Sequence, residues 1–176
     1  LHGSLSSTGE GKISLLGRGA AGAVTVSGVS LEDATITSSG SGTISITATQ
    51  NGNSDGASIA LLLLRSSITS KGNTTIHGTG GASPTIDASE VGSIGVLLDS
   101  TSNLVMQGSA ELTLTGISGQ SSGASQGVVL LGDIASAGQL TSITGTSLNA
   151  TPDSTDNHGV VVQNTINLGA GELRIT

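Results

Sequence analysis

The chain lacks cysteine, phenylalanine, tyrosine and tryptophan, and it has two prolines. Without cysteine it forms neither disulfides nor thiol-based sites, an absence that does not by itself fix the compartment. Without aromatic side chains, which bury about 150–250 Å² each, the core must come from Val, Ile, Leu and Ala. Hydrophobic residues make up 35% of the chain and charged residues 10%, so it is not of the highly charged, weakly hydrophobic type that stays disordered. We expect a folded protein with a narrow core.

Charge is sparse and acidic, with a formal net charge of −7 from 12 acidic and 5 basic residues. The basic residues are scattered: Lys12, Arg18, Arg65, Lys71 and Arg174. Nucleic-acid binding requires a basic patch, often with interleaved aromatic residues, so we expect no nucleic-acid partner. The longest apolar run, residues 59–64, has the length of a buried strand and falls short of the ~18 residues of a membrane helix, so we expect no membrane insertion.

The apolar segment GVVLL at residues 127–131 recurs about every 32 residues. Its counterparts begin at Gly28, Ala60, Gly95, Gly127 and Gly159. A second β-type segment keeps phase with it, at Leu15, Ile46, Ile76, Leu114, Ile143 and Ile175. Two such segments that recur in a fixed order are typical of a stacked repeat.

One repeat contains three short strands, predicted at residues 128–131, around Ile134 and at 140–144. After the third strand come Gly, Ser, Thr, Asn and Asp, residues typical of turns, at 48–58, 78–90, 116–126 and 145–158. Insertions should therefore concentrate at one corner, and no helical periodicity is present. We predict an all-β fold, a right-handed parallel β-helix (β-solenoid) of about five coils of roughly 32 residues, each rising ~4.8 Å.

Hydroxyl side chains follow the outward positions of the third strand in two rows. These rows are Ser45, Thr75, Thr113, Ser142 and Arg174, then Thr47, His77, Thr115, Thr144 and Thr176. Threonine fits a strand while its hydroxyl stays hydrated, so we expect the rows to form a solvent-exposed face.

Segments of the form G-x-G-x-[ILV]-x-[ILV]-[ST], at residues 9–15, 40–46 and 169–176, resemble the repeats of filamentous-haemagglutinin-type exoproteins. They are also similar to repeats of large autotransporter passengers and other giant bacterial surface proteins, and the resemblance covers the whole chain. It implies a secreted adhesin shaft or extracellular fibre at the surface of a Gram-negative bacterium. The chain departs from that family in its longer repeat and its lack of aromatic residues, which argues against a carbohydrate-binding tip.

This resemblance agrees with a chain that begins at Leu1 and carries no signal-peptide pattern. We interpret residues 1–176 as a single β-solenoid segment, a mature segment or a fragment of a longer repeat protein. No cap is evident, so both ends should expose strand edges. The expected partners are further repeats of the same chain or other copies, end to end or laterally, and a host or neighbouring-cell surface.

Two short motifs match enzyme patterns without the required context. Residues 119–123 fit G-x-S-x-G around Ser121, but a nucleophile elbow needs a following helix and they lie in a Gly/Ser loop. Residues 17–22 fit G-x-G-x-x-G, but a dinucleotide site needs those glycines to open a helix and a strand-like segment, 23–26, follows.

Metal binding has little support in the sequence. His2, His77 and His158 are far apart, whereas a zinc site takes four ligands with local pairing, so we expect solvated histidines. The calcium-binding nonapeptide is absent, and residues 80–87 resemble it only loosely. We predict no catalytic, cofactor-binding or metal-binding residue and no cofactor.

The expected function is a non-enzymatic structural or adhesive shaft, and the first alternative is a self-assembling fibre subunit without receptor binding. Two further functions remain as alternatives. A carbohydrate-active β-helix enzyme would need two carboxylates at a defined separation, for which Asp87, Asp99 and Asp133 are the candidates. An ice-binding protein would use the threonine rows, which break at His77 and Ile117.

Overall fold

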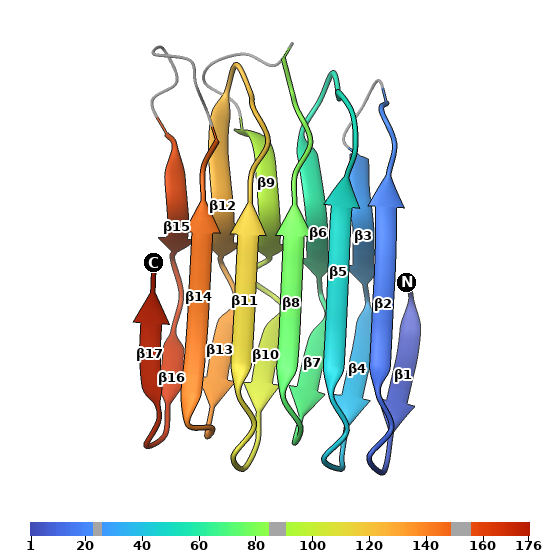
Figure 1. Ribbon diagram of the computed structural model, residues 1–176, viewed down its shortest axis with the longest axis vertical. Helices are drawn as coiled ribbons and strands as arrows, with labels where there is room; N and C mark the ends of the chain where they lie inside the picture. Colours follow the sequence, from blue (N-terminus) through green and yellow to red (C-terminus); the bar gives the residue numbers. More distant parts are fainter. Residues whose placement is uncertain (23–25, 85–90, 149–155) are drawn as a thin grey trace.

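The computed structural model describes residues 1–22, 26–84, 91–148 and 156–176, and these contain β-strands and no helix. No helix capable of crossing a membrane occurs in these four ranges. The strands form three parallel sheets (Figure 1). The front sheet contains β2 (Ile13–Gly19), β5 (Ile44–Gln50), β8 (Thr74–Thr79), β11 (Leu112–Ile117), β14 (Leu140–Thr146) and β17 (Glu172–Ile175). The upper sheet contains β3 (Val26–Glu32), β6 (Ser58–Leu64), β9 (Val91–Leu98), β12 (Ala124–Leu130) and β15 (His158–Val162). The lower sheet contains β1 (Gly3–Ser7), β4 (Ala34–Ser38), β7 (Ser67–Ser70), β10 (Asn103–Met106), β13 (Asp133–Ser136) and β16 (Ile166–Leu168).

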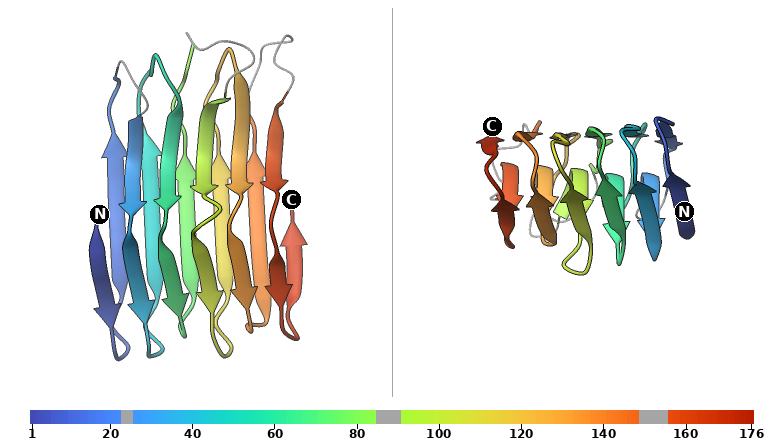
Figure 2. Two further views of the ribbon diagram at one scale, coloured as in Figure 1. Left: turned by 180° about the vertical axis from the view of Figure 1, so that it is seen from behind. Right: turned by 90° about the horizontal axis from the view of Figure 1, so that it is seen from below.

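The chain winds as a flattened right-handed solenoid, which confirms the predicted fold class. In Figure 1 the front strands run upward, the upper and lower strands run downward behind them, and successive coils advance from right to left. The view from below in Figure 2 shows two thin layers, the front sheet in one and the other two sheets in the second. Such a shape needs only a narrow core, in agreement with the absence of aromatic residues.

The predicted alignment of the repeats is the observed strand register. In the front sheet Leu15 pairs with Ile46, and the same column continues to Ile76, Leu114, Ile143 and Ile175. In the upper sheet the column from Val29 contains Leu61, Val96, Val128 and Val160. Each inward residue therefore packs on the corresponding residue of the next coil.

Loop length varies at more than the one corner that the sequence predicted. The long connections do follow the front strands, as at residues 51–57 and 118–123. However, one residue, Asp33, joins β3 to β4, whereas residues 99–102 join β9 to β10. Parts of the predicted loops 78–90 and 145–158, and of the strand-like segment 23–26, lie outside the described residues.

The core below the middle of the front strands consists of aliphatic columns. Ile46, Ile76, Leu114 and Ile143 are fully buried in the front sheet, and they face equally buried Leu and Ile residues of the upper and lower sheets. Met106 is the largest unbranched member and is 1% exposed. Burial of this aliphatic surface, at about 25 cal/mol per Å², stabilises each interface between coils.

A row of small residues brings the front and upper sheets into close approach. In the front sheet it contains Gly17, Ala48, Gly78, Gly116 and Gly145, and in the upper sheet Gly28, Ala60, Gly95, Gly127 and Gly159. A Cβ atom on Gly116 would lie 2.0 Å from the carbonyl oxygen of Gly127, and one on Gly145 would lie 1.8 Å from that of Gly159. We call these ten residues the neck. Glycine or alanine occupies these positions because two backbones approach closely there, and the neck divides the interior into a lower aliphatic lobe and an upper lobe.

Candidate functional surfaces

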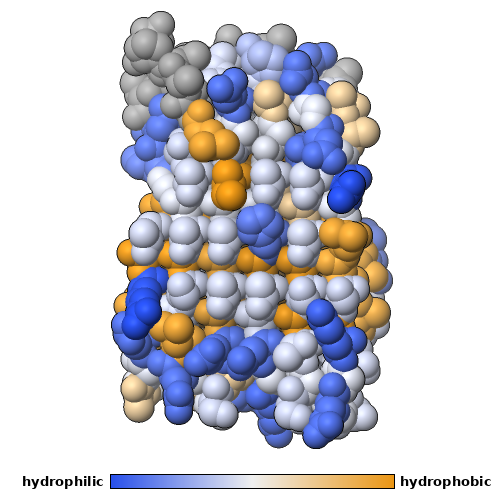
Figure 3. Space-filling view, viewed as in Figure 1, coloured by the Kyte–Doolittle hydropathy of each residue, from blue (hydrophilic) through white to orange (hydrophobic). Residues whose placement is uncertain are grey.

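The front sheet presents rows of hydroxyl side chains to solvent, as the sequence predicted. One row runs through Ser45, Thr75, Thr113 and Ser142, and a second through Thr47, His77, Thr115 and Thr144. Figure 3 shows them as pale bands across the front face. Because strands in a sheet lie about 4.8 Å apart, hydroxyl groups repeat at that interval along the axis.

The hydroxyl rows of the front sheet are interrupted at several positions. His77 interrupts the second row, where its Nε2 lies 3.1 Å from the Thr79 hydroxyl. Leu16 begins the same row and is 70% exposed, and Ile117 interrupts the row of Thr49 and Thr79.

Hydroxyl side chains also lie on part of the lower sheet, where Thr35 is next to Ser67 and Thr37 is next to Thr69; beyond β7 these rows continue as Asn103 and Val105. Hydroxyl rows are therefore not confined to the front sheet.

The outside of the upper sheet carries an apolar strip that the sequence did not reveal. Ile59, Ile94 and Val129 are 8%, 4% and 5% exposed and form a cluster separate from the main core. Partly buried neighbours pack against them: Ala57, Leu62, Leu97, Leu131 and Val161. In the GVVLL-type run, inward and outward positions are both apolar, as in sheets that are covered on both faces.

The corner between the upper and lower sheets is held by a charged ladder across coils. The Arg65 guanidinium donates to both carboxylate oxygens of Asp33 in the preceding coil, from Nε at 2.7 Å and Nη2 at 2.9 Å. Both residues adopt φ near +50°, which non-glycine residues rarely do, and their charged ends are more than half exposed. Hydrogen bonding to Arg65 lowers the pKa of Asp33. An exposed pair of this kind fixes geometry more than it adds stability.

Asp99, one of the three candidate catalytic carboxylates, lies at the same corner one coil after Arg65. Its carboxylate accepts hydrogen bonds from the backbone N–H of Arg65 and from the hydroxyls of Thr101 and Ser102. Partial burial acts to raise the pKa of Asp99, but these hydrogen bonds outweigh it and hold the pKa below its usual value. A carboxylate stabilised in its charged form suits a structural turn better than a general acid, which needs a raised pKa.

Asp133 lies in the coil after Asp99, and Gly132, the residue before it, approaches the carbonyl oxygen of Asp99. Asp133 begins β13, is exposed and pairs with Asn103 of the neighbouring strand β10. Asp87 lies outside the described residues.

The two enzyme-like motifs have structural roles. Ser121 is 4% exposed, and its hydroxyl donates to the carbonyl oxygen of Ser83 in the preceding coil. No helix follows it, since the next element is strand β12. In the other motif, Gly17 and Gly19 lie within β2, and Gly22 bridges to Ser54.

The three histidines lie apart from one another. His2 lies 3.6 Å from the Glu32 carboxylate and His158 lies 4.0 Å from that of Asp156, at opposite ends of the solenoid, and His77 is on the front face. Among the described residues, no three side chains of metal-ligand type gather.

The upper lobe is filled by serine hydroxyl groups, which the sequence analysis missed. Ser58, Ser93 and Ser125 point inward above the neck and are fully buried. The hydroxyl of Ser93 donates to the carbonyl oxygen of Gly81 and accepts from the backbone N–H of Gly119. Ser58 accepts from the N–H of Gly81, and Ser125 donates to the carbonyl oxygen of Gly119. Each of the three serines lies two residues before a neck residue, a regularity that could have revealed them.

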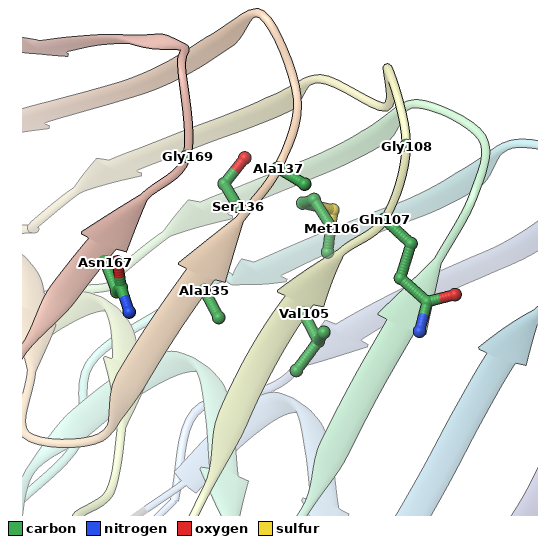
Figure 4. A pocket seen from close by; sticks show the side chains of 9 residues that line it. All are labelled: Val105, Met106, Gln107, Gly108, Ala135, Ser136, Ala137, Asn167 and Gly169. Atoms are coloured by element: carbon green, nitrogen blue, oxygen red, sulfur yellow. The ribbon is translucent and has the colours of Figure 1, made fainter.

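Two hollows lie on the outside of the lower sheet. The larger, of about 370 Å³, has Ala135 as its floor, between Gln107 on one side and Asn167 on the other (Figure 4). The smaller is next to it, at Asp133 and Thr165. Both arise where small residues of β13 lie between longer side chains. Neither contains a buried charge or a paired acid and base.

These observations define the chain as a β-solenoid repeat protein. No protein-family model, curated protein or solved structure matches it.

Proposed function

We propose that this chain is a non-enzymatic structural or adhesive shaft, part of a secreted, surface-exposed protein or an extracellular fibre. One observation carries the proposal: the column from Leu15 to Ile175 passes through all six front strands in a single register. A stack of this kind can be lengthened by any number of coils without a change in cross-section.

The use of the polar residues supports the same proposal. Asp99, Ser121 and Arg65 are side chains whose types would suit chemistry, and each makes hydrogen bonds between coils. The strand-to-strand hydrogen bonds run along the solenoid axis, so a pull along that axis loads many of them together. Stiffness and length are what a shaft must supply.

Location outside the cell is part of the proposal. It rests on the resemblance of the G-x-G segments at residues 9–15, 40–46 and 169–176 to filamentous-haemagglutinin-type repeats. The partners proposed with it are coils of the same kind and a host or neighbouring-cell surface.

Insertion of extra coils tests the shaft. A copy of residues 28–59, one full coil of described residues, is inserted after residue 59 once, twice and three times. Small-angle X-ray scattering then gives the length and the radius of gyration of the cross-section. We expect each copy to add about 4.8 Å of length at a constant cross-section. Inserted coils that unfold, or a length that does not rise with copy number, would contradict the proposal.

A further inference from the structure

The three sheets do not have the same number of strands at the N-terminal end. The front and lower sheets have six strands each and the upper sheet has five. Strands β1 and β2 complete the lower and front sheets beyond β4 and β5, whereas β3 is the edge of the upper sheet. One strand position is therefore open beside β3.

Leu1 occupies the last residue of that open position. Its amine donates to the carbonyl oxygen of Ser30 at 2.6 Å, and the N–H of Glu32 donates to the carbonyl oxygen of Leu1 at 3.0 Å. This is the pattern of a parallel strand with Leu1 opposite Leu31. Leu1 thus extends the inward column of Leu31, Leu63, Leu98 and Leu130, and its amine lies where a strand would place a peptide N–H.

The rest of the open position has the shape of the repeat itself. Val29 is only partly buried, whereas its equivalents Leu61, Val96 and Val128 are at most 1% exposed because strands flank them on both sides. Beside Val29 lies Gly28 of the neck, where an added strand must also approach the front sheet closely. An occupant would need glycine or alanine opposite Gly28, as Ala60 is on the other side, and an aliphatic residue opposite Val29.

We propose that the outer edge of β3 is an acceptor for one further parallel strand that carries the repeat's own pattern, a small residue followed by an aliphatic one. This inference rests on the proposed function, because it identifies where the shaft accepts another coil. The added strand would take up the unpaired backbone groups of β3 and bury Val29 as its equivalents are buried.

A second copy stacked end to end does not fill this position. Suppose that β17 and β16 of one copy pair with β2 and β1 of the next. The coil that contains β1 and β2 has no strand in the upper sheet, so β15 then lies two strand spacings from β3. Moving β15 into contact with β3 would place β16 in the space of β1. Direct stacking therefore leaves a gap in the upper sheet that only an added strand closes.

An N-terminal extension tests the proposal. A copy of residues 124–129 placed before Leu1 puts Leu1 in the place of Leu130, with glycine opposite Gly28 and valine opposite Val29. The matched control carries a copy of residues 123–128, which has the same length but shifts the inward and outward positions by one residue. The readouts are hydrogen exchange of the β3 amides and the urea midpoint.

We expect the in-register extension to slow exchange of the Ser30 amide at least tenfold and to raise the urea midpoint, and the shifted one to do neither. The Ser30 amide is diagnostic because it points to the same side of β3 as the Glu32 amide, which already donates to Leu1. Equal effects of the two extensions, or no protection by either, would overturn the inference. If Ser30 is not protected while inserted coils still lengthen the molecule, the proposed acceptor edge is wrong and the shaft proposal stands. If inserted coils unfold while Ser30 is protected, the shaft proposal is wrong and the acceptor edge stands.

Discussion

Truncation of Leu114 tests whether the columns stabilise the solenoid as a stack. Leu114 is fully buried and lies between Ile76 and Ile143 in the same column. Leu114→Ala removes three carbon atoms, worth about 2.4 kcal/mol at ~0.8 kcal/mol for each buried methylene group. Strand pairing holds both neighbours in place, so the cavity cannot close completely. Buried Leu→Ala changes cost about 2–5 kcal/mol overall, and we expect about 3–4 kcal/mol here.

The matched control is the same substitution at the end of the same column. Leu15 is partly exposed and has one column neighbour, Ile46, so we expect Leu15→Ala to cost about 1 kcal/mol of transfer free energy. Urea unfolding followed by far-ultraviolet circular dichroism measures both, with an unchanged slope m as the condition for comparison. Equal losses in the two variants would refute the view that stability comes from stacking between neighbouring coils.

Three further outcomes follow from the polar residues and the neck. The pKa of Asp99 is lower in the folded than in the unfolded chain, so its stabilising contribution is present above about pH 4 and is lost as the pH falls through the folded pKa. Asp99→Asn should therefore flatten the dependence of the urea midpoint on pH below about pH 5. An unchanged profile would count against the corner hydrogen bonds. Gly116→Val places a Cβ 2.0 Å from the carbonyl oxygen of Gly127 and should lower the free energy of unfolding by about 1–3 kcal/mol or more, which is measured as a lower melting temperature. A neutral result would mean that the front and upper sheets separate easily there. Ser93→Ala leaves the N–H of Gly119 without its acceptor and should cost about 1–3 kcal/mol, with faster exchange of that amide; unchanged exchange would argue that water replaces the hydroxyl.

Much of the fold follows from the sequence because identical columns require identical spacing. Aligning Leu15 with Ile46 and Gly28 with Ala60 predicted the register that the strands adopt. The hydroxyl rows followed from the same alignment, since alternate residues of a strand face opposite sides.

What the sequence did not predict depends on contacts between sheets or on patterns without alternation. The neck glycines marked strand positions, but their cause, the approach of Gly116 to Gly127, needs both sheets to be in place. The apolar strip at Ile59 and Leu62 was hidden because the run from 59 to 64 has no polar residue to mark its outer side. The ladder of Arg65 and Asp33 joins residues of opposite charge 32 positions apart, with no local signal.

The neck also separates two parts of the molecule that can change independently. Below it, aliphatic columns tolerate little change in shape; above it, serine hydroxyls bind the backbone of loops whose lengths already differ from coil to coil. Because Gly116, Gly127 and their equivalents close the interior between the two lobes, a longer or chemically different loop at residues 118–123 would leave the aliphatic columns undisturbed. The same aliphatic columns can therefore be combined with many different loops above the neck, so we expect sequence differences among coils to be concentrated in those loops.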